Sequence, residues 1–399
     1  MARIEFQIAK VIALASLLIG ASVLPASEGD PFPPTDLTEE TLVYVGSRAT
    51  GEEQGIYAFW LQTKNLTVSQ NITLFPIGIA AATPQVTHLE LDPNRRLVFA
   101  LSAVEEFEGT PGGSVVAFAV DAATGTLNPI NQQPSMGAKP CHLALDREVK
   151  YALVTNCASG NLAVFPIGPD GTLGAATQVV STGSADGAGG AQTACVALDP
   201  ENRFGFACET GLSKLFAYRY DAGRGTLTPG EPPSLDAEDG SGPRRLVFRP
   251  DGKFAYAANE LNSTVTAYVY DSQAGSLTPT QNVATVPPYY DGPNRATELG
   301  IHPTGKFLYV SNSGHNSVAL FTVSEADGSL TYVEEQGTGG SNPVSFGIQP
   351  SAKHLAIANH DANTVLVCRI DDGNGRLKPS GLFADVPLPT IVRFLPPAK

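Results

Sequence analysis

One feature limits this chain more than any other: a segment of about fifty residues recurs along most of its length. Each copy holds an apolar hairpin such as LVFRPDGKFAYAAN, and the hairpin turns lie near Pro93, Arg147, Pro200, Pro250, Pro303 and Pro350. A second anchor of the form Gly-x-Leu follows each hairpin. Two anchors that keep one period indicate a repeat architecture, which can hold 399 residues in one domain.

Within each copy the apolar residues alternate with polar ones, as in FAYAANE and STVTAYVYD, which is typical of short antiparallel strands. Three or four strands per copy predict one blade of a β-propeller. The first copy lacks an inner strand, and the C-terminal PTIVRFLPP resembles the missing one. We therefore predict an all-β fold: a single seven-bladed β-propeller over residues 38–398, with the N- and C-terminal strands closing one blade.

The N-terminus resembles an export signal. Arg3 and Lys10 precede the uncharged run VIALASLLIGASVLPAS, and a proline-rich polar segment follows it. We predict that residues 1–30 are a signal peptide and leader, so that the mature protein is secreted or periplasmic and has no integral membrane domain. A retained anchor and a buried N-terminal segment are the alternatives.

The composition excludes some partners. A formal charge of −14 argues against nucleic acid, whose phosphates require a basic surface, and an anionic small ligand would need local arginines. The sequence has no Cys-x-x-Cys or paired-histidine spacing for a metal and no glycine-rich phosphate loop. We predict no metal and no cofactor, and a monomer or weak homo-oligomer.

Several stretches together resemble one known family. They are the YVGS opening, KPCHLALD, GPRRLVFRPDGKFAYAANELNSTV and ELGIHPTGKFLYVSNSGHNSVALF. These resemble the seven-bladed lactonase family, which contains bacterial 6-phosphogluconolactonase and fungal 3-carboxy-cis,cis-muconate lactonizing enzyme. The resemblance extends over nearly the whole predicted mature chain. It implies a hydrolase acting on a sugar-derived or carboxylated lactone.

Arg244 and Glu260 are the first candidates for the catalytic site. Counting outward from the turn at Asp251 and Gly252 places Arg244 opposite about Asn259 and beside Glu260. In the muconate-processing relatives the matching arginine and glutamate belong to the active site. A guanidinium stabilises the charge that develops on a lactone carbonyl, and a glutamate can move a proton. The alternative is an ion pair that only fixes a loop at the rim.

Further residues at the predicted rim complete the set of candidates. His142, placed near Asn156 by the same hairpin count, is the third catalytic candidate, with a structural hydrogen bond as its alternative role. The predicted substrate-binding residues are Arg245, Asn259, Asn156, Glu298, Asn312 and His360.

The chain departs from the family pattern at several of these positions. Gln192 and Ala194 stand where many relatives have a histidine pair, Ser313 and Val344 stand where an arginine is expected, and Arg245 replaces a common histidine. A phosphorylated or multiply carboxylated substrate needs several cations. These departures are typical of a degenerate site, and the alternative function is a noncatalytic propeller that binds a ligand or a protein. A redox propeller has no ligand cluster in its favour.

Five cysteines allow two disulfides in an exported protein. The hairpin count places Cys141 opposite Cys157 and Cys195 opposite Cys208, which is within disulfide range for facing positions. Two disulfides within blades, with Cys368 free, are one hypothesis, and buried free thiols are the other.

Overall fold

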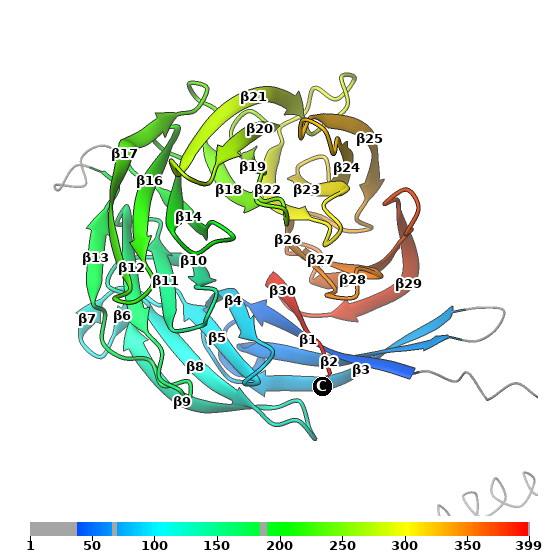
Figure 1. Ribbon diagram of the computed structural model, residues 1–399. Helices are drawn as coiled ribbons and strands as arrows, with labels where there is room; N and C mark the ends of the chain where they lie inside the picture. Colours follow the sequence, from blue (N-terminus) through cyan, green and yellow to red (C-terminus); the bar gives the residue numbers. More distant parts are fainter. Residues whose placement is uncertain (1–37, 66–69, 184–189, 398–399) are drawn as a thin grey trace, which may run out of the picture.

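The computed structural model describes residues 38–65, 70–183 and 190–397, so the predicted leader 1–30 lies outside the described residues. Seven four-stranded antiparallel sheets stand around a central axis (Figure 1). The inner strand of each sheet contacts the inner strands of both neighbouring sheets, which closes the ring. The prediction of a seven-bladed β-propeller is confirmed.

Blade one joins the two ends of the described chain. Its strands, from the axis outward, are β30 (Pro389–Leu395), β1 (Thr38–Ser47), β2 (Ile56–Asn65) and β3 (Gln70–Ala81). β30 and β1 run antiparallel, with Leu42 opposite Leu395 and Gly46 opposite Ile391 (Figure 1). The predicted closure by the two terminal strands is therefore confirmed, because β30 supplies the inner strand of blade one and pairs with β1.

The other blades take their strands in chain order from the axis outward. Blades two and three consist of β4 (Val86–Asp92), β5 (Leu97–Ser102), β8 (Ser114–Val120) and β9 (Leu127–Pro134), and of β10 (Pro140–Leu145), β11 (Tyr151–Asn156), β12 (Asn161–Pro166) and β13 (Gln178–Ser181). Blades four and five consist of β14 (Thr193–Leu198), β15 (Phe204–Glu209), β16 (Lys214–Asp221) and β17 (Thr226–Asp236), and of β18 (Pro243–Phe248), β19 (Phe254–Asn259), β20 (Thr264–Asp271) and β21 (Ser276–Ala284). Blades six and seven consist of β22 (Arg295–Ile301), β23 (Phe307–Ser313), β24 (Ser317–Val323) and β25 (Leu330–Gly337), and of β26 (Pro343–Ile348), β27 (His354–Asn359), β28 (Thr364–Ile370) and β29 (Leu377–Asp385). A short hairpin of β6 (Glu106–Phe107) and β7 (Thr110–Pro111) and one 3-10 turn, η1 (Gly51–Glu53), complete the elements.

The hydrophobic core lies between the blades. Each pair of neighbouring blades shares one cluster of buried side chains. The second strand of a blade supplies both of its neighbours, because successive side chains point to opposite faces. In β19, Ala255 and Ala257 pack toward blade four, while Tyr256 and Ala258 pack toward blade six. Each large side chain buried in this way contributes about 1.5–3 kcal/mol to stability.

The second sequence anchor has a structural reason. The hydroxyl of Tyr256 in blade five donates to the carbonyl of Gly328, the glycine of the Gly-x-Leu anchor in blade six, at 2.9 Å. Tyr309 donates to Gly375 of blade seven in the same way, at 2.7 Å. Gly328 has φ +71°, and a Cβ there would lie 2.3 Å from the Phe254 ring. The anchor at Gly328 must therefore be glycine, and such anchors fix blade six to blade five and blade seven to blade six.

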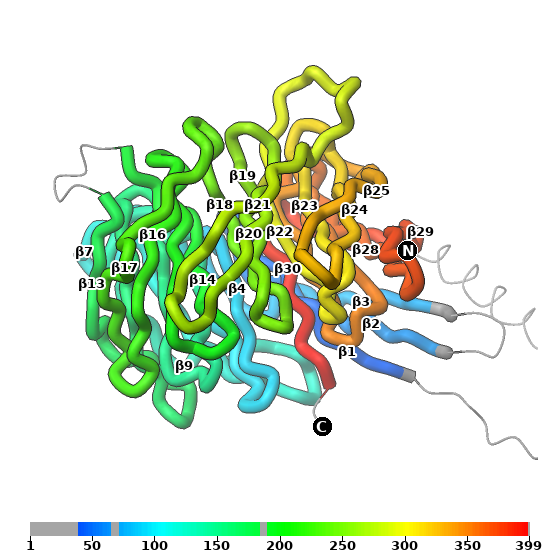
Figure 2. The backbone as a smooth tube through the Cα atoms, turned by 45° about the horizontal axis from the view of Figure 1, so that its top comes forward, coloured from blue at the N-terminus to red at the C-terminus, as the bar shows by residue number. Residues whose placement is uncertain are grey.

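The connection between β21 and β22, residues 285–294, projects from the face of the ring at which β22 and the other inner strands begin (Figure 2). In the described part of the chain no helix is long and apolar enough to cross a membrane.

Candidate functional site

Each inner strand begins with a β-bulge. In blade five Pro243 pairs with Asn259 and Arg245 pairs with Ala258, so Arg244 is the extra residue. We call the extra residue of each blade its bulge residue; the seven are Thr87, Cys141, Ala194, Arg244, Thr297, Val344 and Thr390. A bulge redirects a side chain away from its regular place in the sheet. Arg244 is the one charged member of this set.

The bulge refines the hairpin count. The count places Arg244 opposite about Asn259, and in the structure Asn259 pairs with the preceding residue, Pro243. The count places His142 near Asn156, and His142 pairs with Thr155, the residue before Asn156. Counting from the turn assumes one residue opposite one residue, and this assumption fails where a bulge inserts an extra residue.

The residue at or just after the end of each second strand lies beside the bulge, and we call it the strand-end residue. The seven are Arg48, Ala103, Cys157, Thr210, Glu260, Ser313 and His360. Their equivalence is visible in the backbone: the Glu260 N–H donates to the Gly242 carbonyl at 2.8 Å, and the Arg48 N–H donates to the Leu388 carbonyl at 3.0 Å. Bulge and strand-end residues together form the rim of the central channel.

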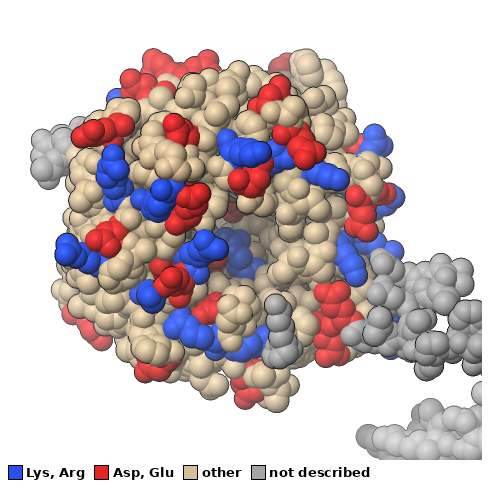
Figure 3. Space-filling view, viewed as in Figure 1, with Lys and Arg blue, Asp and Glu red and all other residues tan. Residues whose placement is uncertain are grey.

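Two connected pockets open at this rim. The larger, which we call the rim pocket, has a volume of about 550 Å³ and is lined by Arg244, Glu260, Arg295 and Thr297 among others. The smaller, the channel pocket, has a volume of about 220 Å³ and is lined by residues that include Arg48, Cys141, Arg244, Arg245, His360 and Thr390. Arg244, Asn342 and Val344 border both. Figure 3 shows the hollow at the centre of the face, with basic and acidic side chains around it.

Arg244 and Glu260 are brought together, as the sequence predicted. Nη1 of Arg244 donates to Oε2 of Glu260 at 2.7 Å, and Nε donates to the Thr297 carbonyl of blade six at 2.9 Å. Oε1 of Glu260 accepts a longer bond from Nη1 of Arg295, at 3.3 Å. The side chain of Arg244 is 29% exposed and that of Glu260 is 10% exposed. The pair is therefore held from two blades and still borders open space.

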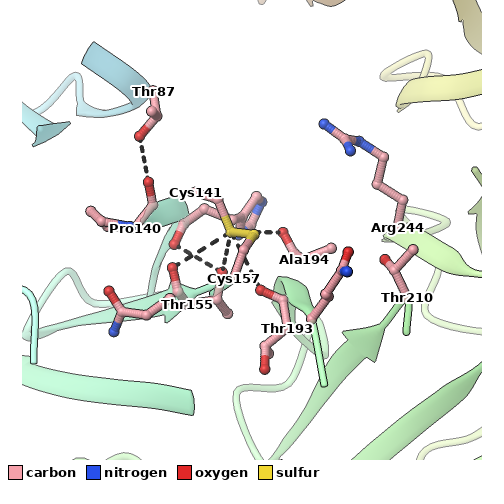
Figure 4. Close-up of a disulfide and its surroundings, with 12 residues drawn as sticks. Thr87, Pro140, Cys141, Thr155, Cys157, Thr193, Ala194, Thr210 and Arg244 are labelled. Carbon is pink, nitrogen blue, oxygen red and sulfur yellow. Dashed lines mark hydrogen bonds between the residues drawn. A yellow bond between two sulfur atoms is a disulfide. The ribbon is translucent and has the colours of Figure 1, made fainter. Parts of the chain in front are cut away.

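This arrangement leaves donor capacity for a ligand. Within the described residues no acceptor contacts Nη2 of Arg244, while its Nε and Nη1 are both engaged. The Arg244 side chain extends into the open space that Thr87 and the Cys141–Cys157 disulfide also face (Figure 4). A guanidinium with a free edge beside a carboxylate can hold a carbonyl or an oxyanion next to a group that moves protons.

Arg245 and Glu298 form a second ion pair below the rim. Nε of Arg245 lies 3.1 Å from Oε1 of Glu298, and Nη1 donates to the Ala194 carbonyl at 3.0 Å. Ser345 donates to the other Glu298 oxygen at 3.2 Å. Burial is the largest single influence and lowers the pKa of Arg245, but the charge and the hydrogen bond of Glu298 and the neighbouring Cys195 and Cys208 together outweigh it, and the pKa is raised. Both residues are predicted to bind substrate, and the structure places them in a buried bracing contact.

His142 lies in the same buried layer. Its ring packs on that of His88 with 4.4 Å between centroids, and its Nδ1 accepts a long bond, 3.4 Å, from the Val196 N–H. Burial, followed by the neighbouring His88 and the charge of Arg245, lowers the pKa of His142 well below its usual value. His142 is therefore neutral near pH 7.

The predicted asparagines are not at the pockets. Asn156, Asn259 and Asn312 lie at or one residue before the end of the second strands of their blades and are fully buried. Their amides donate within the fold: Asn156 to the Ser135 carbonyl (2.8 Å), Asn312 to the Thr285 carbonyl (2.8 Å), and Asn259 to the hydroxyls of Thr264 and Thr266 (2.9 Å each). Asn156 and Asn312 thus hold loops between blades and Asn259 holds the third strand of its own blade, so we do not include them in the site.

His360 does border the channel pocket, and its Nδ1 lies 2.8 Å from Oδ1 of Asp361.

Two arginines at the pockets were not predicted from the sequence. Arg295 lies at the start of β22, and Arg48 follows β1. Aligning YVGSR of blade one with YAANE of blade five would have found Arg48, because both end in the strand-end residue.

A disulfide forms part of the rim. Cys141, the bulge residue of blade three, is bonded to Cys157, its strand-end residue (Figure 4). Cys195 and Cys208 pair across blade four as predicted, but remain free thiols with their sulfurs 3.3 Å apart. Cys368 is free and buried. One of the two hypothesised disulfides is therefore present.

The departures from the family pattern lie at the rim as well. Ala194 and Val344 are bulge residues, and Ser313 is a strand-end residue. Their small or apolar side chains supply no cation at these three places of the rim. Among the residues that the structure describes, no group of three or more His, Cys, Asp or Glu side chains is arranged to hold a metal ion.

Comparison with known proteins establishes the family of this chain. A family model described as "Lactonase, 7-bladed beta-propeller" matches residues 42–394. The chain therefore belongs to the seven-bladed lactonase family, as its motifs indicated.

Individual relatives agree with this assignment. The 6-phosphogluconolactonase of Bacillus subtilis is 30% identical over 358 residues, which are 88% of this chain and 97% of the relative. The 6-phosphogluconolactonase of Formosa agariphila is 30% identical over 263 residues, 64% of this chain and 72% of the relative. Among solved structures, the periplasmic gluconolactonase of Pseudomonas aeruginosa superimposes with a TM-score of 0.79 at 26% identity, covering 90% of this chain and 99% of the other.

Proposed function

We propose that the protein hydrolyses a sugar-derived or carboxylated lactone in the rim pocket. The observation that carries this proposal is the Arg244–Glu260 pair, which is held at 2.7 Å and borders open space in a chain of the lactonase family. Relatives bearing the names 6-phosphogluconolactonase and gluconolactonase support the reaction type.

The reaction needs one water molecule and one proton transfer. Water attacks the carbonyl carbon of the lactone, and negative charge develops on the carbonyl oxygen. The free Nη2 edge of Arg244 stabilises this charge, since a guanidinium in a partly enclosed site is a strong donor. Glu260 takes the proton of the attacking water and returns it to the ring oxygen as the C–O bond breaks, which gives a hydroxy acid.

The remaining candidates take supporting roles in this proposal. Arg245 and Glu298 brace the strands beneath the pocket. His142 supports the same layer as a neutral ring, because its low pKa leaves it without the acidic proton of an imidazolium near pH 7. His360 is positioned to contact a ligand in the channel pocket. Ala194, Ser313 and Val344 reduce the cations at the rim, so we propose a smaller polar site than the family pattern implies.

Lactone hydrolysis by the purified mature chain tests the proposal. The substrates are gluconolactone, 6-phosphogluconolactone and a carboxylated muconolactone, each corrected for spontaneous opening. We expect Glu260→Gln and Arg244→Ala each to lower kcat/KM by about a hundredfold, because each removes a group that acts in the transition state. The matched control is Glu148→Gln, an exposed carboxylate at the opposite end of the inner hairpins, which should keep the wild-type rate.

The rates must be read together with the folding of each variant. Circular dichroism and a thermal melt show whether the variants keep the wild-type fold. A folded wild-type protein with no rate above spontaneous opening on any substrate would contradict the proposal. That result would favour the alternative, a noncatalytic propeller that binds its ligand at the same rim.

We propose also that the protein is exported. The apolar run within residues 1–30 supports a signal peptide. The Cys141–Cys157 disulfide supports an oxidising compartment, and one solved relative is a periplasmic protein. Expression of the full chain in a secreting bacterial host should give a cleaved protein in the periplasm or medium. An uncleaved N-terminus in the cytosolic fraction would contradict export.

A further inference from the structure

Arg48 occupies a special place at the rim. It is the strand-end residue of blade one, the place that Glu260 holds in blade five. Its backbone is fixed by the hydrogen bond to Leu388, so its side chain starts from a defined point. The side chain lines the channel pocket together with Arg244. Blades one and five therefore direct a guanidinium each into the same space.

The guanidinium of Arg48 differs from the other two in this pocket by its lack of a partner. Arg244 has Glu260, and Arg245 has Glu298. Within the described part of the chain no acceptor lies within hydrogen-bond distance of the Arg48 guanidinium, and the described residues that line the channel pocket include no Asp or Glu. Partial burial by the pocket walls, followed by the charge of Arg244, lowers the pKa of Arg48. The pocket thus has positive charge that the protein itself does not neutralise.

We propose that Arg48 binds an anionic substituent of the lactone, a phosphate or a carboxylate, while the lactone ring reacts at Arg244 and Glu260. The proposal rests on the proposed function and assigns a substrate class to that site. Because Arg244 borders both pockets, a ligand whose ring contacts Arg244 in the rim pocket can extend its substituent into the channel pocket. A guanidinium binds both kinds of oxyanion with two parallel hydrogen bonds.

This role makes Arg48 a specificity-determining residue. The protein carries a formal charge of −14, so an anionic substrate is repelled by most of the surface and needs a local cation. Arg295 is 68% exposed and already contacts Glu260, and Arg244 is committed to the reacting carbonyl. Arg48 is the cation that remains for a second anionic group, and a neutral lactone gains nothing from it.

The experiment compares substrate preference in the wild-type protein and in Arg48→Gln. The substrates are glucono-1,5-lactone, its 6-phosphate and glucaro-1,4-lactone, so that one is neutral, one has a phosphate and one has a carboxylate. We expect the ratio of kcat/KM for anionic over neutral lactone to fall about ten- to hundredfold, mainly through KM. A fall for the phosphate alone or for the carboxylate alone identifies the group that Arg48 binds.

Arg224→Gln is the control for net charge. Arg224 lies in the turn between β16 and β17, and its side chain is 83% exposed. We expect Arg224→Gln to keep the ratio of kcat/KM for anionic over neutral lactone within about twofold of the wild-type ratio. An equal ratio in Arg48→Gln and wild type, with hydrolysis intact, would overturn the inference and leave the proposed function standing.

Binding separates the two proposals if the wild-type protein hydrolyses no lactone. Calorimetry with glucose 6-phosphate, glucuronate and glucose measures the anion site without any reaction. Tighter binding of either anion than of glucose, lost in Arg48→Gln, would support the Arg48 site even when the proposed function fails. Equal binding of the three sugars by the wild-type protein would overturn the inference.

Discussion

Two adjacent arginines in β18 meet two glutamates in opposite surroundings. Arg244 is a bulge residue, partly exposed, and its partner Glu260 borders the rim pocket. Arg245 is the next residue, and both it and Glu298 are nearly inaccessible, with side chains 10% and 8% exposed. Two neighbouring arginines thus each form an ion pair with a glutamate, with nitrogen–oxygen distances of 2.7 Å for Arg244 and 3.1 Å for Arg245.

The comparison shows that the surroundings of an Arg–Glu pair, and not its residue types, decide whether the pair can bind a ligand or only stabilises the fold. Around the buried pair, Nε and Nη1 of Arg245 and both carboxylate oxygens of Glu298 have protein partners, which include Ala194, Ser345 and the backbone N–H of Leu299. Arg244 keeps a free edge toward open space. The buried pair joins blades four, five, six and seven, whereas the partly exposed pair is available to a ligand.

The largest expected effect comes from breaking the buried pair. Arg245→Met leaves Glu298 charged and buried without its partner, and we expect it to lower the free energy of unfolding by about 3–5 kcal/mol. Arg244→Met leaves Glu260 with Arg295 and water, so the loss there should be about 1 kcal/mol or less. Equilibrium unfolding in guanidinium chloride measures both.

A double variant tests whether the loss comes from the orphaned charge. Arg245→Met combined with Glu298→Leu removes both charges together, and it should recover most of the stability that Arg245→Met loses. Equal destabilisation by Arg244→Met and Arg245→Met would show that the two pairs do not differ as the structure indicates.

The fold could be predicted from the sequence because each blade corresponds to one copy of a sequence repeat. Fifty-residue spacing, alternating strands and the incomplete first copy together define the blades and their closure. The Gly-x-Leu anchor was visible as a pattern before its contact with a tyrosine of the preceding blade gave it a reason. Such features are local in sequence and recur, so one chain suffices to find them.

The site was only partly predictable. Arg244 and Glu260 were found because they flank one hairpin, and Arg48 was missed because blade one is divided between the two termini. Whether Arg244 or Arg245 lines the rim pocket depends on the bulge, which adds one residue without any mark in the sequence. Asn259 and Glu260 are adjacent, yet only Glu260 borders a pocket, which hairpin counting cannot resolve.

A smaller expected effect is the pH dependence of stability, which involves the buried histidine His88. His88 is fully buried beneath the rim, facing Glu90 of its own strand, Arg393 of β30, His142 of β10 and the charge of Arg245 of β18. Burial, then Arg393 and Arg245, lowers the pKa of His88 well below its usual value. The folded protein therefore keeps the ring neutral while the unfolded chain takes up a proton below about pH 6.5.

Since the unfolded state binds more protons, stability should fall as the pH falls below about 6.5, by up to about 1.4 kcal/mol per pH unit for this ring. Unfolding in guanidinium chloride from pH 7.5 to 5 measures the slope, and His88→Gln should reduce it by that amount. The same slope in wild type and His88→Gln would show that the His88 ring takes up a proton as readily in the folded protein as in the unfolded chain.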